Sequence, residues 1–341
     1  MAIGVIVVTY NSRDVILDCL ESLVASENAD LRILVVDNAS QDDTVSTIRE
    51  WASMERPWNG SGKPFTPLPH GPIPLYESRD RIGGVPIGTI AVLSSATNRG
   101  FAGGVNLGIE TLGHIDDVRY LWVLNPDCMV ENRTAMTLWT RAETAGRFGI
   151  IGGRIYYNSP PEAIQSDGGR VNPWTGKCVP FNRTRIGRDV PAPKEADLDY
   201  VSGAHMLVSR EFVAQVGLMS ENYFLYFEEV DWCLRRGDFP LLFCKDAAVH
   251  HYGGVSIGSP TMLQGPSPLS AYFMARSRLR FMWRFYPAAI PLSLLYTALK
   301  AVTTIARGGR GAGFASLRGL FGFPPSEEMR RKLGKNALIS R

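Results

Sequence analysis

The chain has 341 residues, 45% of them hydrophobic and 20% charged, and a formal net charge of +3. This length allows one large domain with an appendage, or two domains, and the charge is too small to indicate a nucleic acid partner. The five cysteines are odd in number and show no C-x-x-C spacing, so we expect reduced thiols in a cytoplasmic protein rather than disulfides or a zinc site. The N-terminus lacks the pattern of a signal peptide and resembles a first strand.

The first third of the chain alternates between strand and helix patterns. Residues 3–9, 32–36, 89–93 and 120–124 are apolar runs, as expected of strands buried on both faces of a parallel sheet. Residues 54–88 are rich in Pro and Gly and predict a surface insertion. The alternation predicts an α/β fold with a doubly wound, mostly parallel sheet whose ligand site lies at the carboxyl ends of the strands.

The rest of the chain changes character twice. After about residue 145, short strands such as 150–157 and 200–208 are interrupted by glycines and predict a smaller mixed sheet. From residue 267 the spacing of apolar residues is helical, and residues 307–341 are basic. We therefore expect a C-terminal helical, basic region.

Three carboxylates fall within four residues directly after an aromatic run, as Glu228, Glu229 and Asp231. A carboxylate that enters a cleft between aromatic side chains has a raised pKa, which suits it to proton abstraction near neutral pH. Glu229 is the leading candidate for such a base. The alternative for Asp231 is a surface ion pair with Arg235, four residues further along a helix.

Polar residues at the ends of the first two strands predict a nucleotide pocket at the sheet rim. They are Thr9, Tyr10 and Asn11 after the first strand and Asp37 and Asn38 after the second. The alternative for Asp37 is a cap on the next helix. Glycines from Gly100 to Gly108 resemble a phosphate-binding loop, with tight helix packing as the alternative. An NAD fingerprint is excluded, because such a loop directly follows the first strand.

Asn125 and Asp127 follow the fourth predicted strand, with a proline between them. Mg²⁺ and Mn²⁺ prefer oxygen ligands, so one carboxylate, one imidazole and a substrate diphosphate are enough for a site. His250 and His251 are adjacent and face opposite ways in a strand, and we favour His251 as the ligand. The alternatives are a solvated turn for Asp127 and an ordinary histidine for each imidazole.

Seven segments in register make the sequence similar to glycosyltransferase family 2, in its rhamnosyltransferase- and galactofuranosyltransferase-like bacterial branch. They are residues 7–11 (VVTYN), 35–40 (VVDNAS), 98–106 (NRGFAGGVN), 124–127 (LNPD), 202–206 (SGAHM), 227–235 (FEEVDWCLR) and 251–256 (HYGGVS). The resemblance covers about residues 3–280. It implies a glycosyltransferase A-type fold, a nucleoside-diphosphate sugar donor, a divalent cation (Mg²⁺ or Mn²⁺) and inversion at the anomeric carbon.

The resemblance also implies roles for individual residues. Asp37 would hold the nucleoside, Asp127 and His251 the metal, and Glu229 would be the base. Two positions depart from the family pattern, since Asn125 replaces the first carboxylate of Asp-x-Asp and Glu229 replaces the more frequent Asp. The remaining members of the predicted donor pocket are Thr9, Tyr10, Asn11, Asn38, Asn98, Gly100, Phe101, Asn125 and Arg276, with Arg276 and Arg278 as a diphosphate clamp or a solvated basic face.

We therefore predict an inverting glycosyltransferase that transfers a sugar, with rhamnose or another deoxyhexose as candidates, to a glycan or lipid-linked acceptor in cell-surface polysaccharide synthesis. Residues 1–265 would form the catalytic domain, with a nucleotide-sugar half (1–127) and an acceptor half (128–265), and residues 266–341 the helical region. Residues 282–305 mix aromatic, aliphatic and basic side chains, which predicts peripheral contact with the inner face of the membrane, or else packing or a homo-oligomer contact. The alternative functions are a sugar nucleotidyltransferase and an inactive carbohydrate-binding protein.

Overall fold

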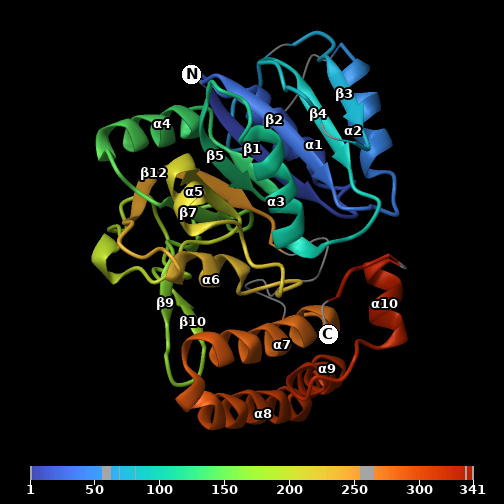
Figure 1. Ribbon diagram of the computed structural model, residues 1–341, viewed down its shortest axis with the longest axis vertical. Helices are drawn as coiled ribbons and strands as arrows, with labels where there is room; N and C mark the ends of the chain where they lie inside the picture. Colours follow the sequence, from blue (N-terminus) through green and yellow to red (C-terminus); the bar gives the residue numbers. More distant parts are fainter. Residues whose placement is uncertain are drawn as a thin grey trace.

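The structure is a computed structural model that describes residues 2–55, 63–68, 70–80, 82–253, 265–334 and 336–339. A ten-stranded sheet crosses it in the order β3-β4-β2-β1-β5-β11-β7-β12-β6, and β8 pairs with β7. The strands are β1 (Ala2–Thr9), β2 (Leu31–Asp37), β3 (Leu75–Ser78), β4 (Ile90–Ser94), β5 (Val118–Leu124), β6 (Cys128–Val130), β7 (Ile150–Tyr157), β8 (Ile164–Ser166), β11 (His205–Ser209) and β12 (Leu241–His251). Figure 1 shows the sheet flanked by helices.

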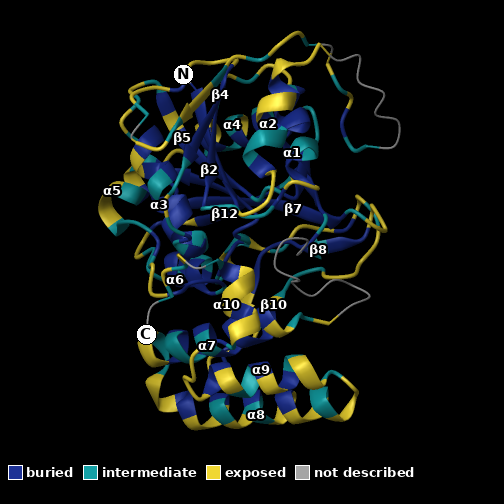
Figure 2. Ribbon diagram, turned by 90° about the vertical axis from the view of Figure 1, so that its right-hand side faces the viewer, coloured by how far each residue is buried: buried dark blue, intermediate teal, exposed yellow. Residues whose placement is uncertain are grey.

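Both faces of the sheet are covered, which explains the continuous apolar runs. Side chains alternate between faces along a strand, so Val5 and Val7 pack on one side while Ile6 and Val8 pack on the other. The first side carries α1 (Ile16–Val24), α2 (Thr44–Ser53) and α4 (Thr134–Ala145); the second carries α3 (Gly100–Leu112), α5 (Arg210–Val216) and α6 (Glu228–Leu234). Strands in Figure 2 are accordingly buried along most of their length. The predicted α/β fold with a mostly parallel sheet is confirmed.

The sheet's pairing explains where the site lies. β3, β4, β2, β1 and β5 are parallel neighbours, whereas β11 runs antiparallel to both β5 and β7. β12 is parallel to β7 and antiparallel to β6. The carboxyl ends of β1, β2 and β5 therefore meet at one edge, and β12 brings its own carboxyl end to the short strand that follows β5.

Two predicted boundaries were wrong. Residues 75–78 form an edge strand inside the predicted insertion, because a four-residue strand with one partner leaves too short an alternation to detect among prolines. Tyr200 forms an isolated β-bridge with Gly169, and residues 201–204 precede β11 as irregular chain, because Gly203 lies in a turn that closes with His205 N donating to Ser202 O. Part of the predicted insertion, residues 56–62, lies outside the described residues.

The C-terminal helices form a separate layer below the sheet in Figure 1. They are α7 (Pro268–Phe285), α8 (Ile290–Ala306), α9 (Arg310–Leu320) and α10 (Glu327–Leu333), with a short 3-10 turn at Pro287–Ala289 between α7 and α8. A hairpin of β9 (Gly169–Val171) and β10 (Cys178–Pro180) extends from the sheet toward α7 and α8. Within the described residues, the stretch Pro287–Ala306 is the one helix long and apolar enough to cross a membrane.

Candidate active site

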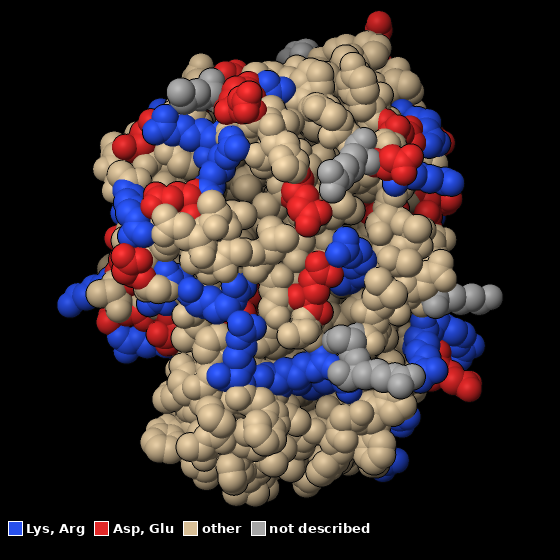
Figure 3. Space-filling model, in the orientation of Figure 1, with Lys and Arg blue, Asp and Glu red and all other residues tan. Residues whose placement is uncertain are grey.

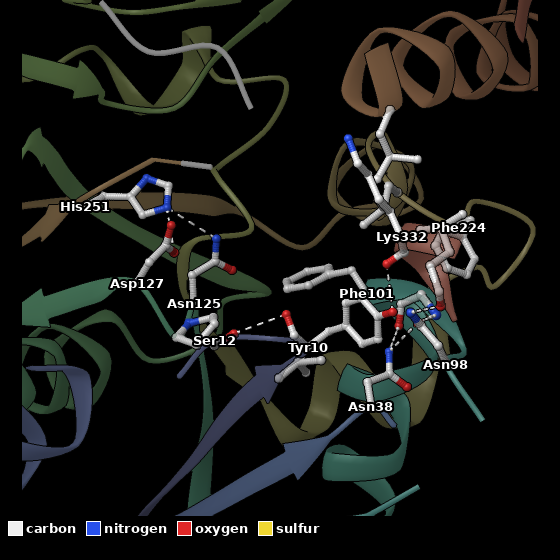
Figure 4. A pocket seen from close by; sticks show the side chains of 16 residues that line it. Tyr10, Ser12, Asn38, Asn98, Phe101, Asn125, Asp127, Phe224, His251 and Lys332 are labelled. Carbon is white, nitrogen blue, oxygen red and sulfur yellow. Dashed lines mark hydrogen bonds and ion pairs between the residues drawn. The ribbon is translucent and has the colours of Figure 1, made fainter. Parts of the chain in front are cut away.

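A cavity opens where β1 and β5 end, between the sheet and the C-terminal helices (Figure 4). Its wall comes from the strand ends, the start of α3, the segment before α6, the end of β12, and α7 and α10. The lining residues are Val8, Tyr10, Ser12, Asn38, Asn98, Gly100, Phe101, Asn125, Pro126, Asp127, Phe224, Leu225, His251, Leu269, Lys332 and Leu333. Six predicted donor residues and both predicted metal ligands are thus brought together.

Asp127 and His251 face each other at one end of the cavity, with His251 Nε2 3.0 Å from Asp127 Oδ1. His251 Nδ1 lies 2.7 Å from Gln165 Oε1, an acceptor, which favours the tautomer that carries its proton on Nδ1. In that tautomer Nε2 directs a lone pair at the Asp127 carboxylate. Two acceptors at this distance repel each other unless a cation or a proton lies between them.

This pair fits a divalent cation. Asn125 Nδ2 lies 3.5 Å from His251 Nε2, and turning the amide over would present its oxygen to the same point. One carboxylate, one neutral imidazole with its tautomer fixed by a neighbouring acceptor, and one amide oxygen suit Mn²⁺ or Mg²⁺. The Cys128 thiol is also close. Burial raises the pKa of this thiol well above its usual value, and Mg²⁺ and Mn²⁺ prefer oxygen ligands, so the chemistry of these cations favours Asp127 over Cys128.

A loop that begins α3 forms the opposite wall of the cavity. Gly100 has φ +74°, and a Cβ there would lie 2.3 Å from the carbonyl oxygen of Phe224, which accepts a hydrogen bond from Phe101 N. Asn38 donates to Asn98 Oδ1 and Gly100 O, and its own oxygen accepts from Arg99 N. At position 100, only glycine tolerates both the positive φ and the close approach to the Phe224 carbonyl oxygen. The loop is therefore fixed before any ligand binds, with Phe101 facing the cavity.

The C-terminal segment closes the cavity on the side of Tyr10 and Asn98. Tyr10 OH donates to Lys332 O at 2.8 Å, and Asn98 Nδ2 donates to Leu333 O at 3.2 Å. Further along, Leu338 N donates to Asn98 O at 2.8 Å. Any ligand that uses Tyr10 or Asn98 must therefore compete with this segment for their hydrogen bonds.

Four predicted donor residues do not line the cavity, namely Thr9, Asn11, Asp37 and Arg276. Thr9 is fully buried between strands, and its hydroxyl has no hydrogen-bond partner among the described residues. Asn11 holds the turn before α2, since its oxygen accepts from Gln41 N at 2.7 Å. Asp37 accepts from Ser40 N and lines an adjoining hollow with Ser95 and Asn336. Burial raises the pKa of the Asp37 carboxyl. Asp37 thus remains beside the strand ends, whereas Thr9 is buried in the sheet and Asn11 holds a turn.

The side chain of Phe101 separates Glu229 from the cavity. A Cβ added at Gly203 would lie 3.3 Å from Phe101 Cε1 and 3.5 Å from Glu229 Cβ, so Phe101 and Glu229 flank this glycine. Burial raises the pKa of Glu229 to about 7. Hydrogen bonds from two backbone N–H groups at the start of α6 lower this pKa, but burial has the larger effect. Such a carboxylate is poised to accept a proton near neutral pH.

The two neighbouring carboxylates differ sharply from Glu229. Glu228 is 3% exposed, one of its oxygens has no partner among the described residues, and burial raises its pKa well above the usual value. Asp231 is fully buried, and its carboxylate accepts three hydrogen bonds. The donors are Arg235 Nε at 2.7 Å, Arg284 Nη1 at 2.9 Å and Tyr223 OH at 3.1 Å. Asp231 therefore holds the fold together and is poorly placed to act as a base. The predicted ion pair with Arg235 exists, but the Asp231 carboxylate in it is buried rather than at the surface.

The backbone before α6 is strained. Tyr226 and Phe227 are consecutive non-glycine residues at φ +66° and +73°, a conformation that costs on the order of 1 kcal/mol or more for each residue. Surrounding contacts enforce it, because Tyr226 OH lies 2.7 Å from Ser270 Oγ and Leu225 O accepts from Ser277 Oγ, both on α7. The strain sets the direction in which Glu228 and Glu229 enter the helix.

Arg276 and Arg278 do not form the predicted clamp. They are two positions apart on α7 and so point to different sides. Arg276 donates to Tyr272 OH and Gly322 O and lines a neighbouring cavity with Arg330 and Arg331, whereas Arg278 donates to Thr297 on α8. His250 points away from the cavity, stacking on Tyr156 near Glu131.

Several cavity residues were not predicted from the sequence. They are Gln165, which holds His251, and the lining residues Phe224, Leu225, Leu269, Lys332 and Leu333. Phe224 and Leu225 belong to the aromatic run before the acidic cluster and offered a signal. The α10 residues offered no such signal, because their contacts with Asn98 span 235 positions of sequence.

The last three residues of the seventh matching segment, 254–256, lie outside the described residues.

Comparisons with known proteins agree with this geometry. The sequence model described as Glycosyl transferase family 2 matches residues 4–63. Low-salt glycan biosynthesis hexosyltransferase Agl10 of Haloferax volcanii is 25% identical over 238 residues, covering 68% of this chain and 61% of that protein. N-acetylglucosaminyl-diphospho-decaprenol L-rhamnosyltransferase of Mycobacterium tuberculosis is 27% identical over 223 residues, covering 57% of this chain and 69% of that protein. The chain spans about three fifths of the length of the first of these relatives.

Two solved structures share the architecture. GalNAc-T7 with UDP, GalNAc and Mn²⁺ has a TM-score of 0.53 at 13% identity, over 94% of this chain and 56% of that one. Mannosyltransferase PcManGT from Pyrobaculum calidifontis with GDP-Man and Mn²⁺ has a TM-score of 0.51 at 14% identity, over 94% and 87%. At these identities the likeness shows the fold alone, and it confirms the glycosyltransferase A-type fold. The resemblance to glycosyltransferase family 2 is likewise confirmed by the sequence matches.

Proposed function

We propose that this chain is a metal-dependent inverting glycosyltransferase that moves a sugar from a nucleoside-diphosphate donor to an acceptor hydroxyl. The observation that carries the proposal is the convergence of two features at one cavity. Asp127 and His251 form an acceptor pair that fits a divalent cation, and Glu229, across Phe101, has a pKa of about 7. The family match and the two relatives support the same activity.

Each residue has a separate task in this reaction. Asp127 and His251 would hold the cation, with Asn125 and the donor diphosphate completing its ligands, and a bound cation neutralises negative charge on a departing diphosphate. Glu229 accepts the proton of the acceptor hydroxyl as it attacks the anomeric carbon. Tyr10, Asn38, Asn98 and Phe101 orient the nucleoside side of the donor. Residues 1–265 would contain all these groups, and residues 266–341 would supply the cover.

A lipid-linked acceptor at a membrane surface fits the C-terminal layer. Leu292, Leu295, Leu299 and Val302 form one exposed stripe along α8, each about half exposed. On the face shown in Figure 3, Lys and Arg form a band along α7, above an end of the molecule that carries few charges. An apolar end bordered by cations suits contact with an anionic membrane. The relative from Mycobacterium tuberculosis acts, by its name, on a decaprenol-linked acceptor.

The membrane contact is tested by co-sedimentation with vesicles that contain phosphatidylglycerol. Wild-type protein should bind and the variant Leu295→Glu/Leu299→Glu should not. Ile186→Glu, which changes another exposed apolar residue, serves as the matched control and should bind like wild type. Equal binding by all three proteins would assign the contact to another surface.

The activity itself is tested by release of nucleoside diphosphate from nucleotide sugars, with a panel of acceptors and with or without EDTA. We expect release that requires Mn²⁺ or Mg²⁺ and increases with an acceptor. Pyrophosphate release from a nucleoside triphosphate and a sugar phosphate would instead indicate a nucleotidyltransferase. Full transfer after exhaustive EDTA treatment would contradict the role given to Asp127 and His251.

A further inference from the structure

Arg278 on α7 is a buried cation with no counter-ion. Its side chain is 6% exposed, and its Nε has no hydrogen-bond partner among the described residues. Nη1 donates to Thr297 Oγ1 at 3.2 Å, and the guanidinium lies 5.3 Å from the centre of the Tyr296 ring. Within the described ranges, no carboxylate lies within ion-pair distance of it. Because a buried and unpaired charge is costly, this position needs either a ligand or some other compensation.

Three more cations lie around Arg278. Lys177 directly follows Gly176, where a Cβ would lie 3.0 Å from Arg278 Cγ, and Lys300 lies one turn of α8 beyond Thr297, which accepts a hydrogen bond from Arg278. Arg183 lies within electrostatic reach of Lys300, as do Arg278 and Lys177. None of the four has an ion pair in the part of the chain that the structure describes. Lys177, Arg183 and Lys300 are exposed, whereas Arg278 is buried. Like charges repel, so their gathering without a counter-ion indicates an anion site.

The β9–β10 hairpin holds this group of cations in place. Its turn packs on α7, because a Cβ at Gly176 would lie 2.8 Å from Met282 Sδ and 3.0 Å from Arg278 Cγ. Its turn also binds α8, since Ser293 Oγ donates to Thr175 O at 3.0 Å. Lys177 directly follows that turn. The site is therefore built from three elements that contact one another.

The same hairpin connects the cations to Glu229. Burial raises the pKa of Cys178 to about 12, the charge of Glu229 adds to this effect, and the charge of Arg278 opposes it. Tyr200 likewise lies within electrostatic reach of Glu229 and Arg183. Geometry gives the same connection, because Gly169 on β9 forms a bridge with Tyr200 and a Cβ at Gly203 would lie 3.5 Å from Glu229 Cβ. Residues 200–203 therefore join the hairpin to Glu229, and an acceptor whose hydroxyl reaches Glu229 would lie beside the hairpin.

We propose that Arg278, Lys300, Lys177 and Arg183 form a subsite for a phosphate or diphosphate group carried by the acceptor. The proposal rests on the proposed function, because it assigns this side of Glu229 to the acceptor. Guanidinium and ammonium groups make charge-assisted hydrogen bonds to phosphate oxygens, and these are about twice as strong as neutral ones. The same chemistry would bind an anionic lipid headgroup, so the test must separate the two sources.

The first test needs no enzymatic activity. Inorganic diphosphate is titrated calorimetrically into the full chain in EDTA, which disables the metal-dependent donor site. We expect wild type and Asp127→Asn to bind alike, and Lys300→Ala and Lys177→Ala to bind about tenfold more weakly or worse, as the loss of one charge-assisted contact predicts. Lys194→Ala, another exposed lysine, is the control and should match wild type. No binding to wild type, or equal binding by all variants, would overturn the subsite.

A second variant separates a ligand site from a structural arginine. Arg278→Met keeps most of the aliphatic stem and removes the charge, so it should leave the melting temperature of the ligand-free protein unchanged or raised while abolishing diphosphate binding. A clear drop in melting temperature would show that the arginine supports the fold and would overturn its role as a ligand group.

The final arm distinguishes an acceptor phosphate from a headgroup. With a phosphate-bearing acceptor, Lys300→Ala should raise the acceptor KM about tenfold and leave the donor KM and the metal dependence unchanged. With an acceptor that lacks the phosphate, the variant and wild type should behave alike. If Lys300→Ala instead weakens binding to phosphatidic acid vesicles and leaves both acceptor KM values unchanged, the site serves the membrane and the acceptor assignment is wrong. Loss of transfer in all proteins with intact diphosphate binding would contradict the proposed function alone.

Discussion

Replacing Glu229 by glutamine tests the assignment of the base most sharply. The amide has nearly the same shape but cannot accept the acceptor's proton, so transfer should fall by about 10²- to 10⁴-fold while donor affinity stays unchanged. Because the Glu229 pKa is about 7, kcat/KM of wild type should rise with pH and level off above it. At pH 6 it should be about one tenth of its plateau, and this limb should be missing from the residual activity of the variant.

Stability gives an independent measure of the same group. The pKa of Glu229 rises from 4.5 to about 7 on folding, so its contribution to stability is fully present below the unfolded value. That contribution is lost as pH rises through the folded value. Glu229→Gln should therefore gain stability relative to wild type between pH 5 and pH 8, measured by urea unfolding, whereas Glu162→Gln at an exposed position should not. Near-normal transfer by Glu229→Gln with an unchanged pH profile would refute the reasoning and transfer the role to Glu228.

Three further predictions follow from single contacts. Gln165→Ala should weaken Mn²⁺ binding about 10- to 100-fold, measured by Mn²⁺ titration with magnetic resonance detection, because His251 loses the partner that fixes its tautomer; unchanged affinity would exclude His251 as a ligand. Asp231→Ala should cost about 3–5 kcal/mol in the free energy of unfolding, because it leaves Arg235 and Arg284 unpaired; a loss of transfer without a loss of stability would restore Asp231 as a base. Gly100→Ala should cost more than about 1 kcal/mol in urea unfolding, because its Cβ meets Phe224 O and its φ is positive; a neutral effect would mean that the loop can rearrange.

The strands near the site were predictable because burial on both faces imposes a local pattern. Residues 3–9 and 120–124 are continuous apolar runs, and polar residues follow each, so the strand ends and the rim between them could be placed. The opposite facing of His250 and His251 follows from the period of a strand. Edge strand β3 was not predicted, because a strand of four residues with one partner has little sequence pattern.

Contacts between distant segments could not be predicted from local patterns. The return of α10 to Tyr10 and Asn98 depends on how four C-terminal helices pack, and nothing in the spacing of residues 327–333 indicates that destination. The paired state of Asp231 depends on Arg284, 53 positions away. Thr9 is polar and ends β1, which predicts a place at the cavity, but the sheet buries it. Residue type suggested polar function, and packing decided which polar groups face the cavity.

The most direct test of the account is donor binding at Asp127 and His251. Melting temperatures are measured for wild type and Asp127→Asn with a panel of nucleoside diphosphates, each with Mn²⁺ and with EDTA. We expect at least one nucleotide to raise the wild-type melting temperature, by linkage between binding and folding, only when Mn²⁺ is present, and we expect no such rise for Asp127→Asn. The absence of any rise in wild type, or an equal rise in EDTA and in the variant, would contradict it.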